Sequence, residues 1–214
     1  MKVAFAHNVF DRYVTLKDTI DIENQLFPDS SISVANNGEM TNNTFQNMKN
    51  VKIVNFHQKT HKIGCVNGCI LSLQQLLKED LDVIVFSHDD VSINMDYITT
   101  VSQHLENIYN GTYDVICRKP SSIFGDNYYM MEVFYVSQNA AIEIFSNLTI
   151  FNEENKIPLD IRGSISPEVW LYSMFVNKNL KIKEITFEQN EYNKQLGEQM
   201  GYKHKNAGLR GWKD

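Results

Sequence analysis

The residues best suited to chemistry in this sequence are Ser87, His88, Asp89 and Asp90, which directly follow the apolar run at residues 83–86. Such a short run of β-branched and aromatic residues predicts a strand buried on both faces. Open α/β sheets bind ligands beyond the carboxyl ends of their strands, where these polar residues would lie. Two adjacent carboxylates repel each other unless a cation or a proton lies between them. The pattern therefore predicts a divalent cation held by carboxylates and substrate phosphates. A solvated acidic turn at the end of a strand is the alternative.

Strands and helices alternate along the chain, and this alternation is what would bring the acidic segment to the edge of a sheet. Runs rich in β-branched residues predict strands, and apolar residues at helical spacing predict helices. The predicted strands are residues 2–7, 32–35, 51–56, 83–87, 114–117, 130–136 and 180–187, and the predicted helices are 12–26, 66–77, 97–108, 139–145 and 167–176. Alternating elements form a mostly parallel sheet through right-handed crossovers. We therefore predict a single α/β domain with a central mixed, mostly parallel sheet flanked by helices.

Composition excludes several classes of function. The formal net charge of -6 argues against nucleic acid as a partner, because phosphate backbones need a basic surface. No apolar run approaches the roughly 20 residues that span a bilayer, so we expect no transmembrane segment. The three cysteines do not suggest a disulfide framework, and the sequence starts with a strand-like segment in place of a signal peptide. We therefore expect a cytoplasmic protein.

Four segments, in order, resemble family 2-like glycosyltransferases of the GT-A fold, which is Rossmann-like. Phe-Ser-His-Asp-Asp-Val at 86–91 is similar to the acidic motif of that family, Asp-x-Asp or a variant such as His-x-Asp. Val-Ala-Asn-Asn-Gly at 34–38 resembles the turn that meets the nucleotide base, and residues 62–68 resemble the Gly- and Asn-containing start of a helix. Glu168 lies where inverting members carry an acidic base at a helix start. The resemblance covers most of residues 1–187.

The sequence departs from the family pattern at three places. His88 replaces the first acid of Asp-x-Asp, and Asn36 and Asn37 replace an Asp pair that usually meets the base. Glu168 is followed by Val169, where many members have Asp. The replacement of the Asp pair by Asn36 and Asn37 leaves open how the nucleotide base is recognised.

The resemblance implies a metal site and a donor. Asp90 would hold Mn²⁺ or Mg²⁺ against the two phosphates of a UDP- or GDP-sugar, and His88 would be a further ligand or a hydrogen-bond donor to the diphosphate. Asp89 would support the site or contact the ribose. The metal would stabilise the leaving nucleoside diphosphate as a Lewis acid. For His88, an ordinary histidine at the end of a strand is the alternative.

The general base implied by the resemblance is Glu168, which would deprotonate the acceptor hydroxyl in a single displacement with inversion. An acid in the first turn of a helix is also favoured by the helix dipole alone. Asp160 is the rival base, and an ordinary ion pair with Arg162 is the alternative role for Asp160.

Further residues are candidates for binding the donor. Ala6, Asn8 and Asn37 follow or end the first two predicted strands and would line the base pocket, and Lys62 and Asn67 would contact the ribose or a phosphate. A turn role for Asn37 is the alternative.

The C-terminal segment is basic, and its His204, Gly208 and Trp212 resemble the His…Gly…Trp segment of a retaining GT-A group, where the His completes the metal site. Arg210 and Lys213 would close over the diphosphate as part of a lid that excludes water. A solvated and partly disordered terminus is the alternative.

These inferences predict one glycosyltransferase domain over residues 1–214, with a nucleotide-sugar-binding half at 1–117 and an acceptor-binding half with the lid at 118–214. The enzyme would move a hexose to a hydroxyl of a glycan or glycoconjugate. A metal-dependent nucleotidyltransferase or phosphohydrolase using Asp89 and Asp90 is one alternative, although a nucleotidyltransferase would carry a Gly-rich basic loop where residues 7–11 read His-Asn-Val-Phe-Asp. A non-catalytic carbohydrate- or nucleotide-binding module is the other.

Overall fold

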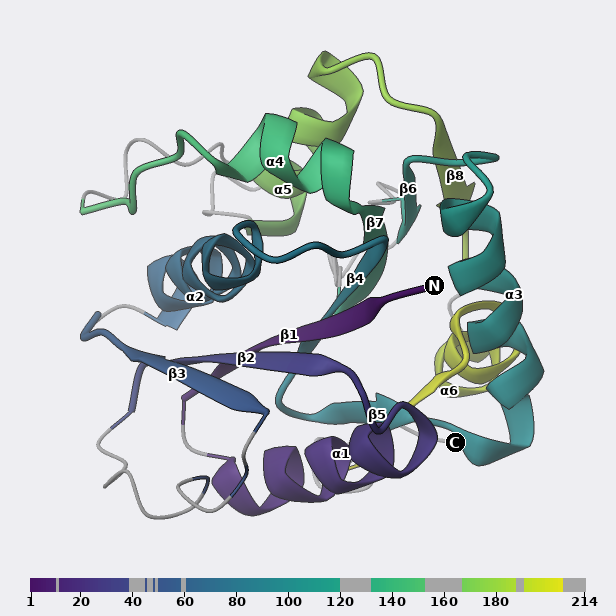
Figure 1. The fold of residues 1–214 in the computed structure, drawn as a ribbon, viewed down its shortest axis with the longest axis horizontal. Coiled ribbons are helices and arrows are strands. Elements are labelled where there is room, and N and C mark those ends of the chain that lie inside the picture. Colours follow the sequence, from purple (N-terminus) through teal and green to yellow (C-terminus); the bar gives the residue numbers. More distant parts are fainter. Residues whose placement is uncertain are drawn as a thin grey trace.

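A seven-stranded sheet runs through the centre of the molecule with the strand order β3-β2-β1-β4-β7-β6-β8 (Figure 1). Its strands are β1 (Val3–Val9), β2 (Ser31–Asn36), β3 (Val51–Asn55), β4 (Val83–His88), β6 (Val115–Arg118), β7 (Val133–Ser137) and β8 (Ile182–Ile185). The structure is a computed structural model that describes residues 1–10, 12–38, 45, 48, 50–58, 61–119, 132–152, 167–187 and 191–205, without the side chains of residues 61, 62, 167 and 168.

Helices cover both faces of this sheet (Figure 1). One face carries α2 (His61–Leu76), α4 (Gln138–Phe145) and α5 (Pro167–Asn177). The other face carries α1 (Tyr13–Leu26) and α3 (Ile98–Tyr109), which follows the short 3₁₀ helix η1 (Met95–Tyr97). The mixed α/β architecture predicted from the sequence is therefore confirmed.

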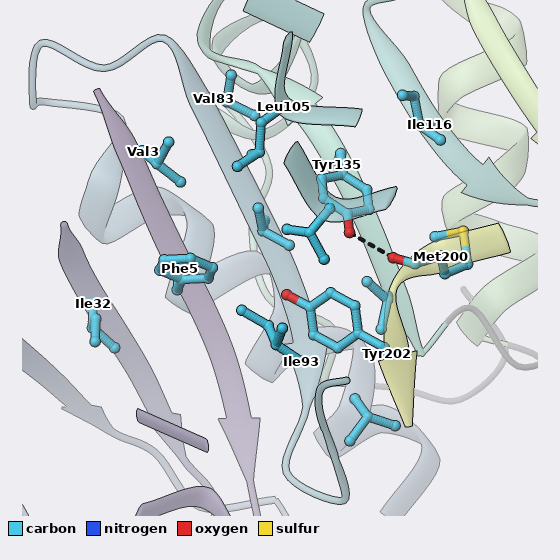
Figure 2. Packing of buried hydrophobic residues seen from close by; sticks show 14 of the residues in the cluster. Val3, Phe5, Ile32, Val83, Ile93, Leu105, Ile116, Tyr135, Met200 and Tyr202 are labelled. Atoms are coloured by element: carbon cyan, nitrogen blue, oxygen red, sulfur yellow. Dashed lines mark hydrogen bonds between the residues drawn. The ribbon is translucent and has the colours of Figure 1, made fainter. Parts of the chain in front are cut away.

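Alternate residues of β1 divide between the two cores, as expected for a strand buried on both faces. Val3 and Phe5 pack on the side of α1 and α3, whereas Ala4 and Ala6 pack on the side of α2. Figure 2 shows the first of these cores, where the Tyr135 hydroxyl donates a hydrogen bond of 2.6 Å to the carbonyl of Met200.

The directions of the strands bring six of their carboxyl ends to one edge of the sheet. β1, β2, β3 and β4 are mutually parallel, and β6 is parallel to β8. β7 runs antiparallel to both β4 and β6, so its amino end lies beside their carboxyl ends. This carboxyl edge is where α/β sheets bind ligands, and it carries the carboxyl ends of β1, β2, β3, β4, β6 and β8.

Residues 191–205 form a segment that we call the C-terminal strap. It contains α6 (Tyr192–Gln195), the π-helical turn η4 (Leu196–Met200) and β9 (Tyr202–His204), which pairs antiparallel with β5 (Val91–Ile93). Gly201 ends the π-helical turn at a φ of 79°, and a Cβ there would lie 2.4 Å from Cγ2 of Val101. The strap buries Leu196, Met200 and Tyr202, and of the basic C-terminal segment that begins at Lys203 the structure describes only residues 203–205.

The other predicted elements are all found, with ends shifted by a few residues. The largest shift is in α2, which begins at His61 and so includes Gly64 and Cys65. Within the described part of the chain, no helix is both long and apolar enough to cross a membrane.

Candidate active site

A pocket opens at the carboxyl edge between β1, β2 and β4. Its lining residues are Asn8, Val9, Phe10, Asn37, Gly64, Cys65, His88 and Asp89. Two glycines let α2 approach these strand ends closely. A Cβ on Gly64 would lie 2.2 Å from Nδ2 of Asn37, and a Cβ on Gly68 would lie 2.6 Å from Cβ of Asn8. Glycine at both positions therefore lets the backbone of α2 lie close against the side chains that line the pocket.

The two amides in this pocket are used differently. Nδ2 of Asn8 donates to the Cys65 carbonyl at 3.3 Å, while its Oδ1 is buried and has no hydrogen-bond partner among the described residues. Oδ1 of Asn37 accepts from the Gln58 N–H at 2.7 Å, and its Nδ2 donates to the Gln58 carbonyl at 3.3 Å. Asn37 thus holds the segment after β3 in place, and Asn8 offers an acceptor to a ligand.

The neighbouring acids Asp89 and Asp90 lie in different surroundings. Asp89 lines the pocket, and its Oδ2 accepts from the Phe10 N–H at 3.3 Å. Asp90 is buried and does not line the pocket. Its Oδ2 accepts a hydrogen bond from Nη1 of Arg12 and lies 3.9 Å from Nδ1 of His204. The acidic motif therefore has one carboxylate on each side of the end of β4.

A cluster of charged and polar residues surrounds Asp90, and we call it the edge cluster. Its members are Arg12, Asp90, Arg118, Glu132, Tyr192 and His204. Nε2 of His204 is 2.8 Å from Oε1 of Glu132, and the Tyr192 hydroxyl donates to Oε2 of the same carboxylate. Glu132 directly precedes β7, so the antiparallel direction of that strand is what brings it to this edge.

Electrostatics in the edge cluster favour a charged His204. Burial alone lowers the pKa of its imidazole, but the hydrogen bond to Glu132 and the negative charges of Glu132 and Asp90 outweigh burial, so the pKa lies above its usual value of 6.5. Burial also raises the pKa of the Tyr192 hydroxyl well above its usual range, and the charge of Glu132 adds to that effect. Tyr192 is therefore a hydrogen-bond donor.

The GT-A resemblance implies a divalent cation beside Asp90, and the residues here fit one only in part. Among the described residues, no three His, Cys, Asp or Glu side chains are arranged to hold a metal ion by themselves. Asp90 and Nδ1 of His204 can supply one oxygen and one nitrogen. Such a pair fits a cation whose remaining ligands are phosphate oxygens of a substrate. Glu132 on the other nitrogen of His204 is the carboxylate that commonly orients a metal-bound histidine.

Most of the predicted site residues that the structure describes come together at this edge. Asn8, Asn37, His88 and Asp89 share the pocket, and Asp90 and His204 meet although they lie far apart in the sequence.

Two predicted donor-binding residues do not join them. Ala6 is fully buried within β1. Asn67 is fully buried in α2, and its amide donates to the Phe151 carbonyl at 2.8 Å and accepts from the Phe151 N–H at 2.7 Å. That amide therefore anchors the chain after α4.

The remaining predictions lie outside the described residues. Asp160, Arg210 and Lys213 are among them, as are the side chains of Lys62 and Glu168. The backbone of Glu168 lies in the first turn of α5, as predicted.

Sequence reasoning missed four members of the edge cluster, which are Arg12, Arg118, Glu132 and Tyr192. Arg12 and Arg118 follow or end predicted strands, so the rule that selected Asn8 applies to them as well. Glu132 fell inside a predicted strand, and Tyr192 in a segment without periodicity. No sequence signal marked these two.

No protein-family profile matches the chain, and no curated protein matches it by sequence. Solved structures do match. One is S. aureus TarS 1–349, with a TM-score of 0.52 and 13% identity over 88% of this chain, which spans 59% of that fragment. The same fragment in complex with UDP-GlcNAc matches with a TM-score of 0.50 and 14% identity, over 88% of this chain and 59% of the fragment. Another is a glycosyltransferase involved in the glycosylation of the major capsid of PBCV-1, with a TM-score of 0.53 and 10% identity over 96% of this chain and 93% of that one.

Proposed function

Because the chain has a GT-A-type glycosyltransferase fold, we propose that it transfers a hexose from a UDP- or GDP-sugar to a hydroxyl of a glycan or glycoconjugate. The observation that carries this proposal is the position of His88, Asp89 and Asp90 between the pocket and the edge cluster. The pocket offers the amide of Asn8 and the carboxylate of Asp89 as hydrogen-bonding groups, which suit a nucleoside. In the edge cluster, Arg12 and His204 beside Asp90 offer positive charge, which suits a diphosphate. The UDP-GlcNAc complex of TarS 1–349 supports a nucleotide-sugar as the donor.

Donor binding would start in the pocket. The buried Oδ1 of Asn8, which has no partner among the residues that the structure describes, is an acceptor for an N–H of the base or a hydroxyl of the ribose. Asp89, on the same wall, is the acceptor for a ribose hydroxyl. A polar group of the ligand that satisfies Asn8 would remove the cost of burying that oxygen without a partner.

The diphosphate would lie next to Asp90. Mn²⁺ or Mg²⁺ would be held there by Asp90 and by His204 or His88, and when bound it would supply Lewis-acid stabilisation of the leaving group. Arg12 adds a second positive charge beside the same carboxylate. Where His88 is that ligand, the charged His204 and Arg12 together balance the negative charge that develops on the nucleoside diphosphate.

The acceptor hydroxyl would lose its proton to Glu168 as its oxygen attacks the anomeric carbon. The bond from that carbon to the diphosphate oxygen breaks in the same displacement, which inverts the configuration. Glu168 lies at the start of α5, and Asp160 remains the rival base. A base must come within hydrogen-bond reach of the acceptor oxygen to act in this way.

The test is binding followed by turnover. UDP- and GDP-sugars are titrated by calorimetry with and without Mn²⁺ into the wild type, Asp90→Asn and the control Asp80→Asn, an acid that pairs with Lys2 on the exposed surface. We expect one donor to bind in a metal-dependent manner, and Asp90→Asn alone to lose it. A hundredfold excess over Kd should stabilise the fold by about 2.7 kcal/mol. Release of nucleoside diphosphate with glycan acceptors then measures transfer.

Two outcomes would overturn the proposal. If the folded protein binds no nucleotide-sugar, the glycosyltransferase activity is wrong and phosphoester substrates become the next to test. If a donor binds but is never turned over, and Glu168→Gln changes nothing, the chain is a binding module.

A further inference from the structure

Arg118 is a buried cation for which the described residues supply no counter-ion. It ends β6 at the carboxyl edge and is only 6% exposed. Its guanidinium carbon lies 4.8 Å from the centre of the Phe187 ring and 5.0 Å from the centre of the Tyr192 ring. Its Nη1 is buried, and no residue in the described part of the chain accepts a hydrogen bond from it.

The acids nearest to Arg118 along this edge already have partners. Both carboxylate oxygens of Glu132 are used, one by His204 and the other by Tyr192. Asp90 is paired with Arg12 and lies beside His204. The edge cluster therefore has two carboxylates, on Asp90 and Glu132, for the two guanidinium groups and the imidazole of His204.

An unpaired buried charge is costly, because the protein interior solvates it poorly. The two aromatic rings offset part of that cost through cation–π contact, and they also fix the plane of the guanidinium. A fixed guanidinium with free donors matches the geometry of a carboxylate or a phosphate. The residue is thus prepared for an anion that none of the described residues supplies.

The position of Arg118 indicates where that anion comes from. In the sheet, β7 separates β6 from β4, so Arg118 lies on the side of the acidic motif away from the pocket. Tyr192, Glu132 and His204 link it to Asp90. Given the proposed function, on which this step rests, the nucleoside lies in the pocket and the sugars lie toward Arg118.

We propose that Arg118 binds a carboxylate or a phosphate on one of the two sugars that react, so that the enzyme is specific for an anionic sugar. The anionic sugar is either the one transferred from the donor or the one that accepts it. Both sources present the same chemistry to the guanidinium.

The test compares pairs of probes that differ only in an anionic group. UDP-glucuronic acid against UDP-glucose reports on the donor. Methyl glucuronide against methyl glucoside, and glucose 6-phosphate against glucose, report on the acceptor, with and without UDP present. Affinities are measured for the wild type, Arg118→Met and Arg118→Lys. We expect at least one anionic probe to bind the wild type about tenfold more tightly than its neutral counterpart, because hydrogen bonds to charged groups are the stronger ones.

That preference should vanish in Arg118→Met and return in part in Arg118→Lys, while the affinity for UDP itself stays unchanged. The melting temperature of Arg118→Met should not fall as far as that of Arg12→Met, because only the latter leaves an acid of this cluster without its ion-pair partner.

The proposal is wrong if no anionic probe is preferred, or if Arg118→Met keeps the preference. It is also wrong if UDP loses as much affinity as the anionic sugars, since Arg118 would then contact the donor diphosphate. Because the sugar probes are measured without UDP as well, a failure of UDP to bind counts against the proposed function separately.

Discussion

Two polar networks meet β4, and each contains a histidine bonded to a carboxylate. In the inner network, Nε2 of His7 is 2.9 Å from Oε2 of Glu23, and Nδ1 of His7 is 3.0 Å from the hydroxyl of Ser87. This order of groups is also the order of a serine nucleophile with its base and its orienting acid. The side chains of His7 and Glu23 are nevertheless fully buried, so no substrate can reach them.

The edge cluster also contains a histidine and carboxylates, but it has a different balance of positive and negative charge. It lies only three residues further along the chain, at Asp90, and it includes Arg12 and Arg118 in addition to its histidine. The comparison shows that access and charge balance decide between a structural and a functional role. The inner network connects α1 to two strands, whereas the edge cluster holds positive charge at the ligand-binding edge.

The largest effect is expected from Asp90→Asn, which removes the charge that pairs with Arg12 and that would hold a metal ion. We expect kcat/KM for transfer to fall by about a hundredfold or more, because metal and electrostatic stabilisation of a leaving group supplies several kcal/mol. Asp89→Asn is the matched control and should cost less, since Asp89 lies on the pocket wall. Equal losses in the two variants would contradict the division of roles between these acids.

Glu23→Ala breaks the inner network instead. We expect the free energy of unfolding to fall by about 1–3 kcal/mol, because removing one partner of a buried hydrogen bond leaves the other unsatisfied. Urea denaturation measures this loss. Glu23→Gln keeps a hydrogen-bonding group and should lose less. The folded fraction of either variant should still bind UDP, and a stable Glu23→Ala protein with weakened UDP binding would show that the inner network has a functional role.

Gly68→Ala tests how closely α2 must approach the pocket. The new Cβ would lie 2.6 Å from Cβ of Asn8, an atom too close to the backbone to move aside. Overpacking of this kind costs about 1–3 kcal/mol of stability, and thermal unfolding measures it. In Gly64→Ala, the clash is with the amide end of Asn37, so we expect weaker nucleotide binding and a smaller loss of stability. The reverse ranking would contradict this arrangement.

The main sheet and the helices around it could be predicted because their signals are local. Runs such as residues 83–86 and the helical stripes need no knowledge of distant residues. The same rules located Asn8, His88 and Asp90, since the ends of parallel strands meet at one edge.

The remaining features of the fold and of the candidate site depend on contacts between segments that are distant in the sequence. Nothing in the sequence of β7 shows that it runs antiparallel, and only that direction brings Glu132 to the carboxyl edge. The strands β5 and β9 are three residues each, too short to show a period, and they pair Val91 with His204. The sequence predicted Asn67 as a donor-binding residue at a helix start, but its amide is hydrogen-bonded to the backbone of Phe151. Such pairs follow from the fold and cannot be read from local pattern.

Two histidines of the C-terminal strap and its surroundings make opposite contributions to stability as the pH changes. His204, in the edge cluster, has a raised pKa because its interactions with Glu132 and Asp90 outweigh its burial. Its contribution is fully present below the unfolded value near 6.5 and is lost as the pH rises through the higher folded value. His104 on α3 instead has a lowered pKa, mainly because it is buried, and the charge of Lys183 lowers it further, against the hydrogen bond to the Gln199 carbonyl, which raises it.

The smallest effect is expected from His104→Gln. The contribution of His104 is present above its unfolded pKa near 6.5 and is lost as the pH falls toward and through the lower folded value. Nε2 of His104 lies 2.7 Å from the Gln199 carbonyl. The centre of its ring lies 5.1 Å from the centre of the Tyr135 ring, in a T-shaped contact. Protonation of His104 would therefore place a charge in an apolar core. Glutamine keeps a donor but does not titrate. Urea denaturation between pH 7.5 and 5 should therefore show a smaller loss of stability in His104→Gln than in the wild type, and an equal loss would mean that the strap is docked without help from a neutral His104.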